Sequence, residues 1–65
     1  FYQSISDYSK VIEIDPNDAA SYYRRGLEKI ELKLTIDGCR DLDKAKNLGL
    51  QEAEKALKQH CHEIL

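Results

Sequence analysis

Residues 19–30 read AASYYRRGLEKI, and this stretch decides the fold. Its apolar and small residues recur at intervals of three, one, three, one and three, at positions Ala19, Tyr22, Tyr23, Gly26, Leu27 and Ile30. These intervals place all of them on one face of an α-helix, because an α-helix turns once in about 3.6 residues. The stretch therefore predicts an amphipathic helix, and Asn17 or Asp18 is expected to cap its first turn through a side-chain oxygen.

One helix is predicted before this stretch, over residues 2–14. Its apolar residues recur at intervals of four, three and four, at Phe1, Ile5, Tyr8 and Ile12. The helix is expected to end at Asp15, because the residue before Pro16 is forced out of helical backbone angles.

Two more helices are predicted after it. Thr35 is the expected cap of the first, whose inner face holds Gly38, Cys39, Leu42 and Ala45. Gly49 should end it in a left-handed conformation, with Leu50 folding back on Ala45. The inner face of the last helix holds Leu50, Ala53, Leu57, Cys61 and Ile64. The predicted fold class is all-α, with about four helices joined by short connections into antiparallel hairpins.

Length and charge exclude several classes of protein. The chain has 65 residues, which is enough for a single small domain. Its 10 basic and 12 acidic side chains form no basic stripe of the kind that binds nucleic acid. No apolar run approaches the ~20 residues of a membrane helix. We therefore expect no nucleic-acid partner and no membrane, and since the chain contains no methionine we expect it to be part of a longer protein.

The sequence repeats weakly at an interval of 34 residues. The identical pairs are Asp7 with Asp41, Lys10 with Lys44 and Ala19 with Ala53. The apolar positions also stay in register over the same interval. A period of 34 residues is typical of helix-turn-helix solenoids.

On these residues the chain resembles the tetratricopeptide repeat family. Tyr22 and Gly26 match the opening aromatic residue and the glycine of the repeat, and YYRRGL at 22–27 is similar to a common variant of it. Gly38, Leu42 and Ala45 stand at the small, aromatic and alanine positions of its second helix. The chain departs from the family pattern at Arg25, Lys29, Lys33 and Leu50, which stand in place of a large apolar residue, an aromatic residue, a glycine and a proline.

The resemblance implies an α-solenoid fragment of stacked antiparallel hairpins. Residues 1–18 would be the second half of a repeat, residues 19–52 one full repeat, and residues 53–65 a terminal capping helix. An unrelated four-helix bundle with accidental periodicity is the alternative.

Gly26 and Gly38 lie inside helices, where each costs about 1 kcal/mol relative to alanine. The resemblance implies that these two glycines touch where the helices of one hairpin cross.

The resemblance also implies a function, that of a non-catalytic protein-protein interaction scaffold at the end of a repeat array. The first helix of the hairpin would line a concave groove for a peptide or protein partner, through Ala20, Tyr23, Arg24, Leu27, Ile30 and Glu31. Family members that clamp a chaperone tail use lysine, asparagine or arginine where this chain has Tyr23 and Leu27, so that role is disfavoured. Arg24 and Arg25 could still pair with an acidic partner.

Two alternatives remain open, a structural cap with binding located upstream and a thiol or metal-site protein. The resemblance implies that the first helix lacks its antiparallel partner, so the isolated fragment is expected to form a homodimer through Phe1, Ile5, Tyr8 and Ile12. A compact monomer, in which the second and third helices cover this face, is the alternative. His60, Cys61 and His62 are the only cluster that suggests metal or nucleophilic chemistry. Successive helical residues turn by about 100°, so the two histidines point apart. The sequence predicts no enzyme, no metal and no cofactor.

Cys39 and Cys61 are expected on the inward faces of two consecutive helices. The residues allow one disulfide or none, and they leave the redox compartment undetermined. A free buried pair is favoured, because packed helices usually hold side chains farther apart than a disulfide allows.

Overall fold

The computed structural model describes residues 2–61, without the side chains of residues 2 and 3, and contains four α-helices and no strand over that range. The helices are α1 (Tyr2–Ile14), α2 (Ala19–Glu31), α3 (Thr35–Asn47) and α4 (Gln51–His60). The predicted all-α fold class is confirmed. Phe1 lies outside the described residues, as do His62, Ile64 and the rest of the segment after Cys61 that was expected to continue the capping helix.

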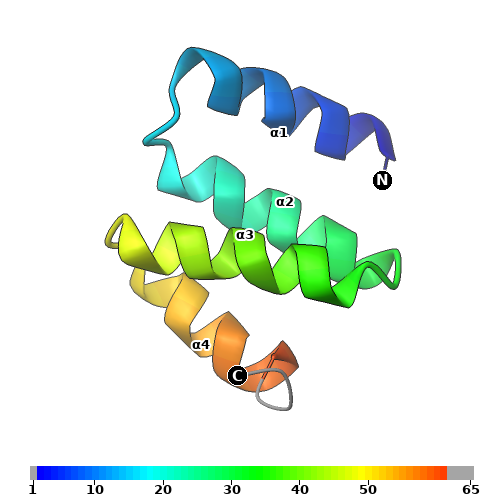
Figure 1. Cartoon of the computed structure of the whole chain (residues 1–65), viewed down its shortest axis with the longest axis vertical. Helices are drawn as coiled ribbons and strands as arrows, with labels where there is room; N and C mark the ends of the chain where they lie inside the picture. The colour runs from blue at the N-terminus through cyan, green and yellow to red at the C-terminus, as the bar shows by residue number, and fades with distance from the viewer. Residues whose placement is uncertain (1, 62–65) are drawn as a thin grey trace.

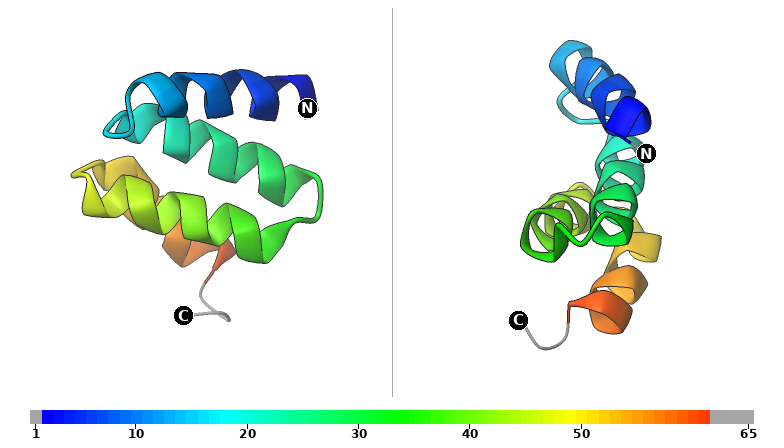
Figure 2. Two further views of the ribbon diagram at one scale, coloured as in Figure 1. Left: turned by 45° about the horizontal axis from the view of Figure 1, so that its top comes forward. Right: turned by 90° about the vertical axis from the view of Figure 1, so that its right-hand side faces the viewer.

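Consecutive helices run in alternating directions and pack on one another (Figure 1). The hairpin of α2 and α3 forms the centre, with α1 against α2 and α4 against α3. Figure 2 shows α2 and α4 on the same side of α3. The chain measures 31 × 25 × 13 Å along its principal axes, so the fold is flat. This packing is compatible with a stack of hairpins, in which each helix contacts mainly its neighbours in sequence.

The turn between α1 and α2 is held by Asp15. Its side-chain Oδ1 accepts a hydrogen bond of 3.2 Å from the backbone N–H of Asn17, and its carbonyl oxygen accepts one of 3.1 Å from Asp18. Asp18 is the cap residue of α2, but its carboxylate accepts from the hydroxyl of Ser21 at 2.9 Å. The expectation that Asn17 or Asp18 would accept from a backbone amide is wrong, because the serine hydroxyl is the donor in reach.

The start of α3 also differs from the expectation. Leu34, and not Thr35, is the cap residue, and no side chain caps this helix. The Leu34 carbonyl oxygen already accepts from the Gly38 N–H at 2.9 Å, which closes the first helical turn. The end of α2 holds Leu34 in place, because the Leu34 N–H donates to the carbonyl oxygen of Lys29 at 2.8 Å.

Two helices end in the same left-handed cap. After α3, Gly49 has φ 105°, its N–H donates to Lys46, and the Leu50 N–H donates to Ala45. This is the predicted glycine cap, which satisfies carbonyl groups at the helix end. After α2, Lys33 occupies the equivalent position with φ 69°, a backbone angle that side chains other than glycine adopt only at a cost.

The core lies between α2, α3 and α4. Leu42 and Cys61 are fully buried, and Cys39, Ala56 and Leu57 complete the cluster. Tyr23, Leu27 and Ile30 of α2 are half-buried and pack against it. The core contains several alanines and few large side chains, so helices approach closely. Over the described residues, no helix combines the length and the apolar character needed to cross a membrane.

The closest approach is at Gly26 and Gly38. A Cβ atom added to Gly26 would lie 2.7 Å from the Gly38 carbonyl oxygen, and one added to Gly38 would lie 2.6 Å from the Gly26 carbonyl oxygen. The backbones of α2 and α3 are therefore in contact at this crossing, and neither position has room for a side chain.

Candidate partner-binding groove

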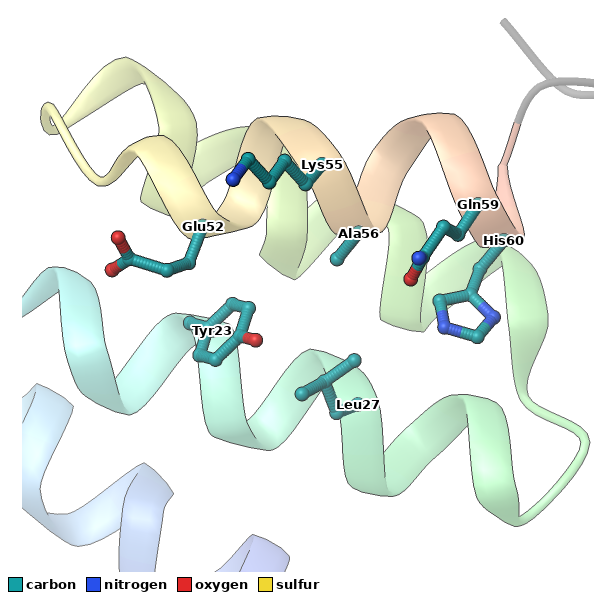
Figure 3. Close-up of a pocket in the computed structure, with 7 residues that line it drawn as sticks. All are labelled: Tyr23, Leu27, Glu52, Lys55, Ala56, Gln59 and His60. Carbon is teal, nitrogen blue, oxygen red and sulfur yellow. The ribbon is translucent and has the colours of Figure 1, made fainter.

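A groove of about 350 Å³ opens between α2 and α4 (Figure 3). Two of its lining residues, Tyr23 and Leu27, lie one turn apart on α2. The other lining residues come from α4 and are Glu52, Lys55, Ala56, Gln59 and His60. Tyr23 and Leu27 are also two of the six residues that the repeat resemblance assigns to partner binding.

The groove exists because side chains of unequal size meet across it. Tyr23 and Leu27 contact the core and also line the groove, so both are held in place by packing. Ala56 lies opposite them on α4 and is small, which leaves space that a larger residue would fill. The floor is therefore apolar and preformed, as in most ligand and peptide sites.

The rim on α4 is polar and carries both signs of charge. Glu52 lies beside Tyr23, whereas His60 lies at the far end beyond Leu27, with Lys55 between them along the helix (Figure 3). The side chains of Glu52, Lys55, Gln59 and His60 are all exposed. They can therefore exchange water for a partner's polar groups at little cost in desolvation.

The structure places the six groove residues expected from the sequence in three settings. Tyr23 and Leu27 line the groove. Ala20, Arg24 and Glu31 are exposed on α2 and do not line it. Ile30 packs on α3, where its Cγ1 atom would lie 2.7 Å from a Cβ atom on Gly38, so it belongs to the helix crossing.

The contribution of α4 to the groove was missed from the sequence. The available signal was the run of polar residues Glu52, Lys55 and Gln59, at intervals of three and four, beside the buried stripe of the same helix. Such a stripe is usually a solvated face. Only the position of α4 beside α2 shows that this polar stripe faces the groove.

Arg25 lies at the centre of an ion-pair network that joins three helices. Its Nε and Nη2 atoms donate to the two carboxylate oxygens of Asp41 on α3, each at 2.8 Å. Its Nη1 atom donates to the hydroxyl of Ser9 on α1 at 3.1 Å. Lys29 Nζ lies 3.1 Å from the same Asp41, whose side chain is only 9% exposed. The guanidinium also lies over the Tyr22 ring, 5.5 Å from its centroid.

This network includes two residues at which the chain departs from the repeat pattern that it resembles. Arg25 and Lys29 stand where that pattern has a large apolar residue and an aromatic residue, and Asp41 provides the countercharge for both. The hydrogen bond to Asp41 raises the pKa of the Arg25 guanidinium above its ordinary value. Three of the five N–H groups of Arg25 are used within the fold, and its pairing with an acidic partner stays a prediction. Arg24 is exposed.

The expectation of free thiols is also wrong. Cys39 and Cys61 form a disulfide, with a Cα–Cα distance of 6.0 Å and a sequence separation of 22. That distance lies within the range of about 4.4–6.8 Å that a disulfide requires. Cys61 follows the last residue of α4 and has non-helical backbone angles, so it can approach α3 more closely than a residue inside a helix could.

On α1, the apolar residues expected to mediate self-association are half-buried. These are Ile5, Tyr8 and Ile12. The exposed large apolar residues of the helix are Val11, at 40% exposure, and Ile14, at 87%. An unpaired apolar surface is therefore present on α1, but its most exposed part lies at the end near the α1–α2 turn.

Within residues 2–61, no three side chains among His, Cys, Asp and Glu are grouped so that they could hold a metal ion. No protein-family profile, curated protein or solved structure matches the chain.

Proposed function

We propose that the chain is a non-catalytic protein-protein interaction scaffold, the carboxy-terminal part of a tetratricopeptide-repeat array that presents a groove to a peptide or protein partner. The groove between α2 and α4 carries this proposal. The helix packing, the 34-residue repeat and the contact between Gly26 and Gly38 support the repeat assignment.

The groove has the features of a small recognition site. Tyr23 offers a rigid aromatic surface with a hydroxyl group at its tip, and tyrosine is enriched among residues that dominate binding energies. Leu27 extends the apolar floor by one turn. A partner would place an apolar side chain on this floor and pair its polar groups with Glu52, Lys55 or His60.

Peptides selected for binding to the chain from a random displayed library test this proposal. We expect Tyr23→Ala and Lys55→Glu each to weaken binding of the selected peptides at least about tenfold, as hot-spot losses do. Lys58→Glu is the matched control, because it makes the same charge change on the same helix at a side chain that is 76% exposed and does not line the groove. Equal binding to the Lys55 and Lys58 variants would show that the groove is not the site.

The second candidate function is a structural cap that self-associates while binding occurs upstream. The 87% exposure of Ile14 favours it, because an apolar residue so exposed beside Val11 can be covered by a second copy. Sedimentation equilibrium of the isolated chain should then give a mass above 7.5 kDa that falls with dilution. Ile14→Lys should lower that mass, whereas Ile36→Lys, at a site 60% exposed elsewhere, should not. A constant monomer mass at high concentration would exclude this function for the chain.

A further inference from the structure

The α4 helix is short and is anchored mostly by small side chains. Over the described residues it has 10 residues, and its buried side chains are Ala53, Ala56 and Leu57. Only one of these is large. Isolated helices shorter than about 12–15 residues are marginal in water, so α4 depends on its tertiary contacts to stay folded.

The disulfide is the strongest of these attachments. One end of α4 is held by its short connection to α3 through Gly49. The other end is held by Cys61, which directly follows the helix and is bonded to Cys39 of α3. Without that bond, the second end would be held by the packing of the Leu57 and Cys61 side chains in the core.

The groove depends on the position of α4. Five of its seven lining residues come from this helix, and His60 is the direct neighbour of Cys61 in the sequence. Any movement of the end of α4 therefore displaces His60 and Gln59 from their places opposite Leu27 (Figure 3).

We propose that the Cys39–Cys61 disulfide is a redox latch for the groove: the oxidised chain holds α4 beside α2, and reduction by a dithiol releases α4 and dismantles the groove. The latch rests on the proposed function for its purpose, since it regulates access to the same groove. It does not rest on the identity of the partner.

The chemistry is thiol–disulfide exchange with a dithiol reductant. A thiolate of the reductant attacks one sulfur of the pair, forms a mixed disulfide and expels the other cysteine as a thiolate, which takes up a proton. The second thiol of the reductant then attacks the mixed disulfide and expels the remaining cysteine, which is also protonated. Two electrons and two protons pass to Cys39 and Cys61, and the reductant becomes a disulfide.

Burial determines how the latch opens. Cys39 is 5% exposed and Cys61 is fully buried, so a reductant reaches them only after the last turn of α4 has opened. A partner that contacts both α2 and α4 would oppose that opening and slow the reduction. By the reciprocity of linked equilibria, reduction would weaken binding of the same partner by the factor by which the partner shifts the thiol–disulfide equilibrium toward the disulfide.

Hydrogen exchange of the backbone amides, measured with and without dithiothreitol, tests the latch. Mass spectrometry under non-reducing conditions should first show a mass lower by two hydrogens than that of the dithiol form, and two free thiols after air or diamide oxidation would overturn the proposal. On reduction, amides of α4 should lose protection at least about tenfold, whereas those of α2 and α3 should change by less than about twofold. Reoxidation should restore the protection of α4.

The double variant Cys39→Ala/Cys61→Ala is the control. It should resemble the reduced chain and should not respond to dithiothreitol. If α4 keeps its protection in the reduced chain, the disulfide does not hold the helix and the latch is refuted. If all helices lose protection together, the disulfide stabilises the whole fold, and the latch is refuted as well. Neither result requires a partner, so failure of the latch is distinct from failure of the proposed binding function.

Discussion

Replacement of Gly26 by alanine places two opposing effects in direct competition. In an exposed helix this change stabilises by about 1 kcal/mol, because alanine has the higher helix propensity. In this fold the new Cβ atom would lie 2.7 Å from the Gly38 carbonyl oxygen, 3.0 Å from Leu42 Cγ and 3.2 Å from Asp41 Cβ. The first of these contacts is with backbone, so the clash is relieved only if α2 and α3 move apart.

Overpacking of this kind costs about 1–3 kcal/mol, and it also disturbs a core in which Leu42 has no exposed surface. After the gain in helix propensity of about 1 kcal/mol, we expect Gly26→Ala to destabilise the chain by up to about 2 kcal/mol. In a domain of this size, each 1 kcal/mol corresponds to a fall in melting temperature of about 4–8 °C.

Thermal unfolding followed by far-UV circular dichroism, on the oxidised chain, measures this change. Arg24→Ala on the exposed face of α2 is the control and should alter stability by less than about 0.5 kcal/mol. Helix propensity raises the melting temperature and the clash lowers it, so the direction of the change in melting temperature shows which effect is larger. If Gly26→Ala melts above the wild-type chain, the two helices do not meet at this residue.

Two further changes test the helix ends and the charged network. Lys33→Gly should stabilise the chain by about 0.5–1 kcal/mol in urea unfolding, because glycine tolerates the left-handed angle at this cap; a lower midpoint would mean that the cap is not formed. Asp41→Ala should destabilise by about 2–4 kcal/mol, because it leaves Arg25 and Lys29 without their countercharge. Equal stability of Asp41→Ala and wild type would show that the network is not formed. Because the pKa of Arg25 is raised, the contribution of Arg25 to the free energy of unfolding should persist across the neutral pH range and fall only as the pH approaches that of guanidinium deprotonation.

Local signals predicted most of the fold. The period of the apolar residues and the stop before Pro16 indicated a helix over residues 2–14, which is the extent of α1 in the structure. The cap at Gly49 was predictable because it depends only on neighbouring residues along the chain. Tyr23 and Leu27 were expected as groove residues from the repeat resemblance, and both line the groove.

Features that depend on contacts between helices were not predictable from periodicity. The pairing of Arg25 with Asp41 joins residues that are 16 positions apart, and the sequence pattern gave no distance between them. The disulfide was not predictable for the same reason, because its formation depends on how closely the end of α4 approaches α3. The cap residue of α3 is Leu34 and not the expected Thr35, because a hydrogen bond to Lys29 at the end of α2 holds Leu34 in place.

The ion-pair network also helps to hold the helices in one alignment along their lengths. If α3 slid along α2 by one turn, about 5.4 Å, Gly26 and Gly38 would no longer meet, and a residue with a side chain would lie at a crossing that has no room for one. Such a slide would carry Asp41 away from the fork of Arg25 and leave a carboxylate that is nearly excluded from water without a partner. The network thus reinforces the alignment that the contact between Gly26 and Gly38 already requires, and through Ser9 it extends the same alignment to α1.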